Sequence, residues 1–113
     1  MRKIEIGTEK YTTVYAVDML EHNANHYYEV MSGGNTIQSV RFQKGATKEH
    51  GVNGVMNEDL IAMVIDRLES FQNSQFKCRE NELAITKLEE ALLWLRHRTT
   101  KREKRGVEGT HII

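Results

Sequence analysis

A four-residue linker between two stretches of helical periodicity constrains the fold of this chain more than any other feature. The linker is QNSQ, at 72–75, and apolar residues recur at helical spacing from about 58 to 72 and again from about 77 to 103. A connection this short returns the second helix against the first. The sequence therefore predicts an antiparallel two-helix hairpin in the second half of the chain.

The ends and faces of these helices can be assigned further. Asn57 occupies the position expected for the N-cap of the first helix, and Glu58 and Asp59 suit the positive end of its dipole. Leu93 and Trp94 widen the apolar stripe of the second helix beyond one face. Because each helix of a hairpin buries only one side against the other, the surplus apolar surface predicts packing against a sheet and against another subunit.

The first half of the chain is patterned as strands. The stretches TTVYAVDML, HYYEVM and TIQSVRFQ are rich in β-branched and aromatic residues, and KIEIG adds a short strand. Gly33 and Gly34 can adopt the positive φ of a tight turn between the last two of the longer strands. We therefore expect an α+β fold: a single domain with a small antiparallel β-sheet of three or four strands in residues 1–50, followed by the helical hairpin in 51–113, and assembled as an oligomer.

Size and composition narrow the class of protein. The chain has 113 residues, of which 39% are hydrophobic and 28% charged. Such a chain forms an ordinary globular domain that is too small to enclose a sizeable ligand by itself, so we expect pockets shared between chains. The sequence has no apolar run that could span a membrane, and MRKIEIG lacks the hydrophobic segment of a secretion signal. We expect a cytosolic protein with no membrane partner.

Charge is distributed unevenly along the chain. The 16 basic and 16 acidic residues cancel in total, but residues 96–113 hold six of the basic and two of the acidic side chains. This segment therefore carries +4 and residues 1–95 carry −4. A protein that binds long duplex spreads basic charge over a face, and an acidic remainder repels such a ligand. The pattern favours a compact anion over long nucleic acid.

Residues that can carry catalysis or hold a metal are sparse. The sequence contains no G-x-S-x-G, P-loop, H-E-x-x-H or C-x-x-C motif. His22 and His26 fall among the expected strands without a third clustered ligand, so we interpret them as surface residues. Cys78 is expected to be a small apolar filler at the start of the second helix. Glu89 and Glu90 point in different directions on a helix and are expected to be solvated residues or salt-bridge partners. We expect no cofactor and no metal.

The segment HRTTKREKRGVEGTH, at 97–111, is the best candidate for a binding site. Its arginines provide planar guanidinium groups that can donate two hydrogen bonds to a phosphate. Thr99 provides a hydroxyl, and Gly106 and Gly109 let the backbone approach a ligand. The alternative is that the basic residues only complement the dipole at a helix end and keep the protein soluble. The set suits a phosphate and a base, which RNA and small nucleotides both offer.

Two motifs, CRENELAITKLEEAL at 78–92 and RGVEGTH at 105–111, lie in a stretch from 51 to 111 that resembles a known hairpin domain. This domain is found in a family of small phage proteins, the anti-Thoeris and anti-CBASS sponges, which sequester the cyclic nucleotide signals of bacterial immunity. The strands before the hairpin make the chain resemble the anti-Thoeris branch. The resemblance covers over half of the chain closely and the whole chain in architecture.

The resemblance implies a non-enzymatic protein that acts in the cytoplasm of the infected host cell. It implies capture, without degradation, of a cyclic ADP-ribose isomer made by a TIR-domain enzyme. Some relatives also hold cyclic trinucleotides at a separate site, which adds a second implied ligand class. The family further implies a homo-oligomer, either a dimer or a trimer of dimers.

The resemblance also implies site residues. Phe71 is similar to the stacking aromatic of the ADP-ribose pocket, Asn81 to its amide and Arg98 to a phosphate contact. The implied set continues with Thr99 and with the segment where symmetry-related chains meet around a trinucleotide, namely Arg105, Gly106, Val107, Gly109, Thr110 and His111. A ligand with two phosphate charges and an adenine needs an aromatic side chain that stacks on the base, polar donors for the ribose and cations for the phosphates. Each of these three residues has an alternative role without a ligand. Phe71 can continue the apolar stripe, Asn81 can cap a helix and Arg98 can point into solvent.

Three classes of function follow. The first is a sponge, which needs a dissociation constant in the nanomolar range, about −12 kcal/mol, and no catalytic residues. The second is an RNA- or DNA-binding module that uses the basic helix end, with strongly salt-dependent affinity. The third is an enzyme that degrades the signal, for which the sequence supplies little.

Overall fold

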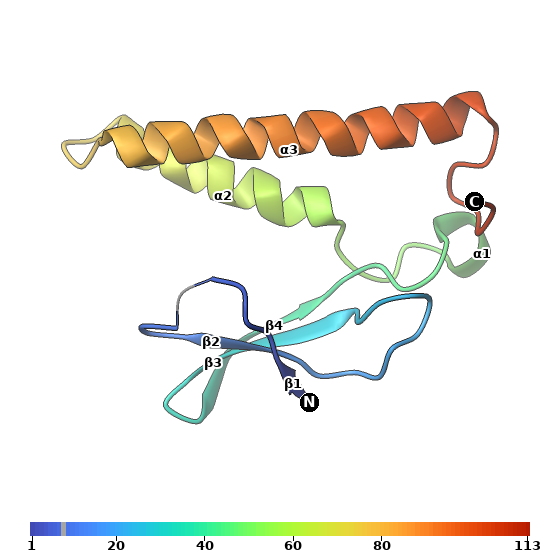
Figure 1. Ribbon diagram of the computed structural model, residues 1–113, viewed down its shortest axis with the longest axis horizontal. Helices are drawn as coiled ribbons and strands as arrows, with labels where there is room; N and C mark the ends of the chain where they lie inside the picture. Colours follow the sequence, from blue (N-terminus) through green and yellow to red (C-terminus); the bar gives the residue numbers. More distant parts are fainter. Residues whose placement is uncertain (8) are drawn as a thin grey trace. The chain divides into compact units, whose positions relative to one another are not determined.

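The computed structural model describes residues 1–7 and 9–113, which form two compact units, Met1–Val55 and Met56–Ile113. The first unit contains a four-stranded antiparallel sheet and the second a pair of long helices (Figure 1). The predicted α+β class with a small antiparallel sheet is confirmed, while the oligomer stays a prediction. Among the described residues, no helix is both long enough and apolar enough to cross a membrane.

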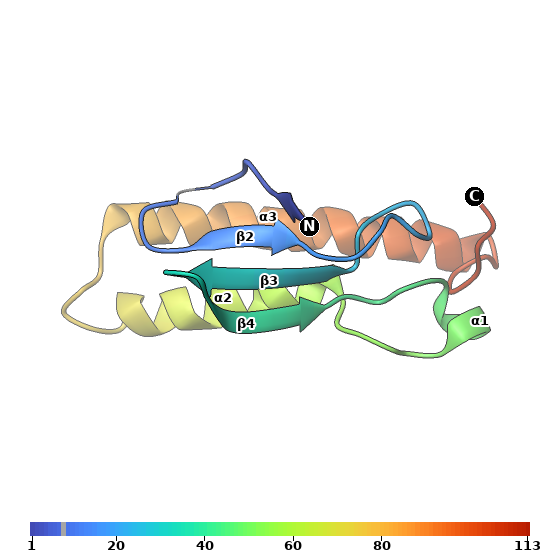
Figure 2. The same cartoon turned by 90° about the horizontal axis from the view of Figure 1, so that it is seen from below.

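Each strand of the sheet pairs with its neighbour in the chain, in the order β1-β2-β3-β4 (Figure 2). The strands are β1 (Arg2–Lys3), β2 (Thr13–Ala16), β3 (Tyr27–Ser32) and β4 (Asn35–Arg41). The predicted turn between the last two is confirmed: Gly33 and Gly34 have φ of 57° and 83°, and Ser32 pairs with Asn35. Two consecutive positive φ values are typical of the type I′ turn, whose twist matches that of the strands.

The register of the strands gives the sheet one apolar face. Ala16 lies opposite Tyr28, and Tyr28 lies opposite Val40. Ala16 is 1% exposed and is the only buried hydrophobic side chain that the described residues contain. Beyond the end of β4, the Phe42 ring meets the Tyr28 ring edge-on with centroids 5.6 Å apart. Val40 and Phe42 therefore share the face that their alternation in the sequence predicts.

The loop between β2 and β3 is organised around Asp18. Its carboxylate accepts hydrogen bonds from the backbone N–H groups of His26 and Tyr27, at 3.0 and 3.1 Å. Desolvation opposes ionisation, but these two bonds and one from the Asn25 amide lower the pKa of Asp18 below its ordinary value. The strand predicted over 12–20 is therefore too long: β2 ends at Ala16, the Val17 N–H makes a further bond to the Tyr27 carbonyl at 2.9 Å, and the chain then turns at Asp18.

The sheet is followed by a segment that the sequence did not predict. It contains a four-residue helix, α1 (Thr47–His50), and returns so that Val55 bridges Phe42 in parallel. The Val55 N–H donates to the Arg41 carbonyl at 2.9 Å. A Cβ atom at Gly54 would lie 2.4 Å from the Phe42 carbonyl oxygen, so this close backbone approach requires glycine.

The second unit consists of α2 (Asn57–Gln72) and α3 (Arg79–Lys104), which pack against each other as the predicted hairpin. Half-buried residues recur at alternating spacings of three and four, as in coiled coils. The residues of this stripe are Glu58, Ile61, Ile65, Leu68 and Gln72 in α2, and Asn81, Ile85, Leu88, Leu92, Leu95, Thr99 and Arg102 in α3, and Leu60 and Ala91 are half-buried beside it. With 16 residues against 26, α2 is about 15 Å shorter than α3, so the last turns of α3 extend beyond it (Figure 1).

The ends of the helices differ in detail from the prediction. The N-cap of α2 is Met56, so the assignment of Asn57 was wrong by one residue; Asp59 caps the helix by accepting the Met56 N–H at 2.8 Å. Gln72 clamps the linker, because its amide both donates to the Cys78 carbonyl and accepts the Cys78 N–H, each at 3.0 Å. Cys78 is exposed at the N-cap of α3, so its prediction as an apolar filler was wrong.

The tail after α3 folds back on the helix end. Gly106 has φ of 73°, its N–H donates to Glu103 O, and the Val107 N–H donates to Arg102 O, which together make a Schellman cap. The Arg102 guanidinium then donates through Nη2 to three tail carbonyls, those of Val107 at 3.1 Å, Thr110 at 3.0 Å and Ile112 at 2.8 Å. Arg102 therefore holds the tail in one conformation.

Replacing Gly54 tests the close approach at the end of the sheet unit. Gly54→Ala should destabilise the protein by about 1–3 kcal/mol, because the added methyl group meets backbone atoms that cannot move aside. Gly33→Asn is the matched control, since this turn position is open and asparagine tolerates its φ. Urea denaturation of the two variants measures the difference, and equal stabilities would contradict the assignment.

Replacing Arg102 tests its hold on the tail. Arg102→Leu should speed amide hydrogen exchange at Thr110 by about tenfold or more, because hydrogen bonds from a charged donor typically contribute about 1.5–3 kcal/mol. Arg96→Leu is the control, since Arg96 is an exposed arginine of the same helix. Unchanged exchange at Thr110 in the Arg102 variant would show that the Schellman cap alone orders the tail.

Candidate functional site

The hairpin carries two of the predicted site residues at its linker end. Phe71 is the penultimate residue of α2, and Asn81 lies in the first turn of α3. The Gln72 clamp on Cys78 fixes the short connection between them. The Phe71 ring is 38% exposed, and Asn81 is half-buried at the start of the inner stripe of α3. An aromatic face and an amide are thus available at one end of the hairpin.

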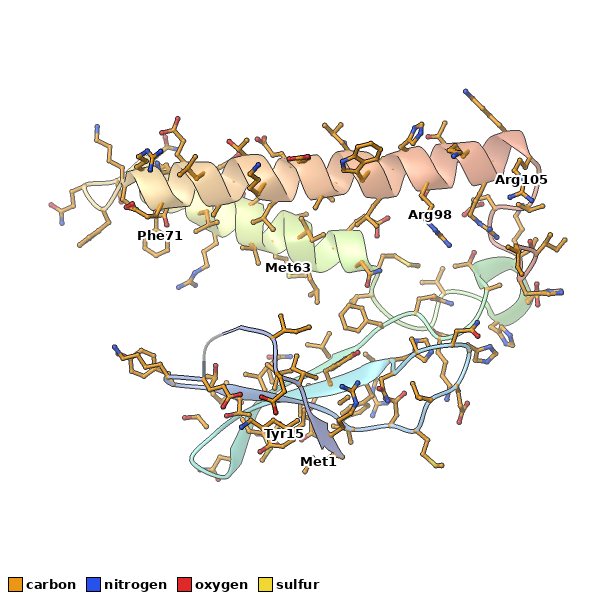
Figure 3. The ribbon with its side chains drawn as sticks, in the orientation of Figure 1. Met1, Tyr15, Met63, Phe71, Arg98 and Arg105 are labelled. Carbon is orange, nitrogen blue, oxygen red and sulfur yellow. The ribbon has the colours of Figure 1, made fainter. Side chains whose placement is uncertain are left out.

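Arg98 and Thr99 lie at the other end of α3. Arg98 follows Asn81 by 17 residues of continuous helix, which separates their backbones by about 25 Å. Figure 3 shows Phe71 and Arg98 toward opposite ends of the hairpin. Arg98 is exposed, whereas Thr99 is half-buried and its hydroxyl donates to the Leu95 carbonyl at 3.2 Å. The Thr99 hydroxyl proton is therefore already bonded, which leaves the oxygen as an acceptor. Within one chain, the structure does not bring Arg98 together with Phe71 and Asn81.

The tail residues form a third group. Gly106 and Gly109 both have positive φ, 73° and 77°, so both positions suit glycine. The Thr110 hydroxyl donates to the Val107 carbonyl at 2.5 Å, and the Arg105 guanidinium donates to the Ile113 carbonyl at 2.6 Å. The structure thus brings Arg105, Gly106, Val107, Gly109, Thr110 and His111 together in a single folded cap.

The extension of α3 and the tail concentrate positive charge. Lys101, Arg102 and Lys104 occupy the last turn of α3, where the helix dipole is negative. Arg102 directs Nη2 into the tail, but Arg98 is exposed on the side of the helix. The cationic segment predicted from the sequence is therefore partly a structural cap and partly an exposed cationic surface.

Sequence reasoning missed three residues of these groups. Arg102 and Gln72 both fall on the alternating three-and-four stripe of half-buried positions, and a polar residue on such a stripe signals a buried hydrogen-bonding role. Arg67 precedes Phe71 by four residues, which places the two side chains on the same face of α2. Its guanidinium carbon lies 5.4 Å from the centroid of the Phe71 ring.

The remaining candidates are histidines of the sheet unit and the glutamate pair of α3. The His22 ring lies 6.5 Å from that of His26 and 5.0 Å from that of His50, between ring centroids. Nevertheless, within residues 1–7 and 9–113 no group of three or more histidine, cysteine or acidic side chains is arranged to hold a metal ion. Glu90 pairs with Lys87 at 3.8 Å on the surface, as predicted for this pair of glutamates.

Comparison with known proteins agrees with the helical hairpin. Residues 35–100 match the family described as "Acb2/Tad1, hairpin domain". The chain is also similar to "Thoeris anti-defense 1" of Bacillus phage SBSphiJ7, with 48% identity over an alignment of 136 positions that covers 96% of each chain. Because the family match spans more than half of the chain and the relative matches nearly all of it, this protein belongs to the anti-Thoeris family of phage anti-defence proteins that carry the Acb2/Tad1 hairpin.

Proposed function

We propose that this protein is a non-enzymatic sponge that binds a cyclic ADP-ribose isomer made by a TIR-domain enzyme and withholds it from its effector in the host cytoplasm. Membership of an anti-defence family supports the general role. The observation that carries the specific proposal is the placement of an exposed aromatic ring and an amide at one end of the hairpin and open cations at the other. These groups match the adenine, ribose and diphosphate of such a ligand.

The 25 Å separation along α3 supports a shared site. One small nucleotide does not span that distance, so Phe71, Asn81 and Arg98 of one chain cannot all touch the same molecule. An antiparallel arrangement of two copies brings Arg98 of each chain toward the linker end of the other. A closed two-fold assembly of this kind makes two identical pockets.

Exposed apolar side chains on the hairpin support the same assembly. Leu93 and Trp94 on α3 are 65% and 66% exposed, and Met63 on α2 is 59% exposed. Leu93 and Trp94 are neighbours on α3, and large apolar residues exposed next to each other often mark an interaction surface. We therefore propose a homo-oligomer, a dimer or a trimer of dimers, in which burial between chains encloses most of the ligand surface and makes slow release possible.

The tail supports a second ligand class. Its cap presents backbone at two glycines beside the exposed Arg105, and three caps brought together around a symmetry axis suit a cyclic trinucleotide with three phosphates. We propose that Arg105, Gly106, Val107, Gly109, Thr110 and His111 form this separate site. The basic end of α3 also favours an alternative function, binding of RNA or DNA, which predicts salt-dependent affinity for oligonucleotides of many sequences.

Capture and release distinguish these functions. Protein incubated with the product of a TIR-domain enzyme, then separated from free ligand and heated, should release the ligand intact in a chromatogram. A new product would identify an enzyme. Absence of capture, combined with salt-dependent binding of oligonucleotides, would identify the nucleic-acid-binding module.

Phe71→Ala and Asn81→Ala should each weaken capture of the ADP-ribose isomer by about 10- to 100-fold, because stacking on an aromatic and a polar contact are each worth about 1–3 kcal/mol. Phe76→Ala and Asn73→Ala are matched controls from the same linker region. Titration calorimetry measures affinity, and native mass spectrometry should show the wild-type assembly in all four variants. Wild-type affinity in both site variants would place the pocket elsewhere.

Arg105→Ala should weaken binding of a cyclic trinucleotide by about tenfold or more while changing the affinity for the ADP-ribose isomer little, because the two ligands occupy separate sites. Competition binding with both ligands measures the two affinities in one sample. Equal losses for the two ligands would argue for a single shared pocket.

A further inference from the structure

Arg67 holds its charge beside the exposed ring of Phe71. The two residues are one helical turn apart on α2, and the Arg67 guanidinium carbon lies over the Phe71 ring, 5.4 Å from its centroid. Both side chains are exposed. The linker half of the hairpin thus has a cation of its own, separate from the cationic extension of α3.

The donors of Arg67 are open. No ion pair or hydrogen bond engages its guanidinium in the part of the chain that the structure describes, residues 1–7 and 9–113. The half-buried Arg102, by contrast, donates to three backbone carbonyls of the tail. A guanidinium can rest its face on an aromatic ring while its in-plane N–H groups reach an anion. The ring therefore restricts the side chain of Arg67 and leaves its phosphate-binding edge available.

A purely structural role accounts poorly for this contact. Cation–π pairs at exposed sites are worth only a fraction of the energy of a charged hydrogen bond to phosphate. The nearest acidic residue in the sequence, Asp66, points to another side of the helix, because adjacent residues on a helix do not face each other. An unneutralised arginine on the ring that is proposed to carry the base has a more direct use in binding the charged part of the same ligand.

We propose that Arg67 is a phosphate-binding residue of the Phe71 pocket. This inference rests on the proposed function and adds a residue to that site. The ligand has two phosphate charges, and each shared pocket then offers two arginines, Arg67 from the chain that supplies Phe71 and Arg98 from the second copy. Arg67 makes the pocket selective for a phosphorylated nucleotide over a neutral nucleoside, because only the former gains a charged hydrogen bond on binding.

Two substitutions of Arg67 and one control test the assignment by titration calorimetry at low and high salt. The probes are the purified cyclic ADP-ribose isomer from a TIR-domain enzyme and adenosine, which shares the base and lacks phosphate. Arg67→Gln should weaken binding of the isomer by about 10- to 100-fold and reduce its salt dependence, while leaving adenosine binding unchanged. Arg67→Lys should restore only part of the loss, because lysine keeps the charge and loses the planar fork. Arg79→Gln, which removes an exposed arginine from the same end of the hairpin, should bind the isomer as the wild type does.

Three results would overturn the inference. The first is wild-type affinity of Arg67→Gln for the isomer. The second is an equal loss for adenosine, which would mean that Arg67 only orients the Phe71 ring. The third is an equal loss of affinity in Arg79→Gln, which would mean that the overall positive potential at this end of the hairpin, and no specific contact of Arg67, strengthens binding. Failure of the wild-type protein to bind the isomer would reject the proposed function itself, and is distinct from these three.

Discussion

The packing of a 16-residue helix against a 26-residue helix is the constraint on which the rest of the hairpin depends. The inner stripe of α3 continues for about 15 Å beyond its partner, and it changes from isoleucine and leucine to Thr99 and Arg102 where α2 can no longer cover it. Hydrogen bonds replace apolar packing at that point. The Arg102 guanidinium donates hydrogen bonds to three tail carbonyls, so the last residues of the chain pack on the end of α3 that extends beyond α2.

This division of the hairpin also divides its binding groups. The clamped linker end has Phe71 with Arg67 over its ring, and Asn81 at the start of α3. The overhanging end has Arg98 on its open side and the glycine-containing cap beyond it. A continuous helix keeps these ends apart, and for that reason we propose that each site is shared between two chains. Leu93 and Trp94, which lie between the two ends along α3, are exposed, and the proposed homo-oligomer would bury them against a second copy.

Particular residues show how far sequence reasoning reached. Gly33 and Gly34 were predictable because a two-residue turn between twisted strands requires positive φ at both positions. The end of β2 was not, because Asp18 stops the pairing through hydrogen bonds to residues eight and nine positions later. The role of Cys78 was predicted wrongly, because its position depends on the Gln72 side chain, which a hydrophobic pattern does not reveal.

The sequence by itself determined the α+β class, the helical hairpin, the family and the concentration of positive charge near residue 100, because periodicity, turn residues and charge are local properties of the chain. Only the tertiary structure decided which cations remain open. Arg102 is bonded to backbone carbonyls that come close only when the tail folds back, whereas Arg67 lies over an aromatic ring and has no hydrogen bond or ion pair with any residue that the structure describes. The physical reason is that the availability of a charged group depends on its three-dimensional neighbours, which the order of residues does not specify.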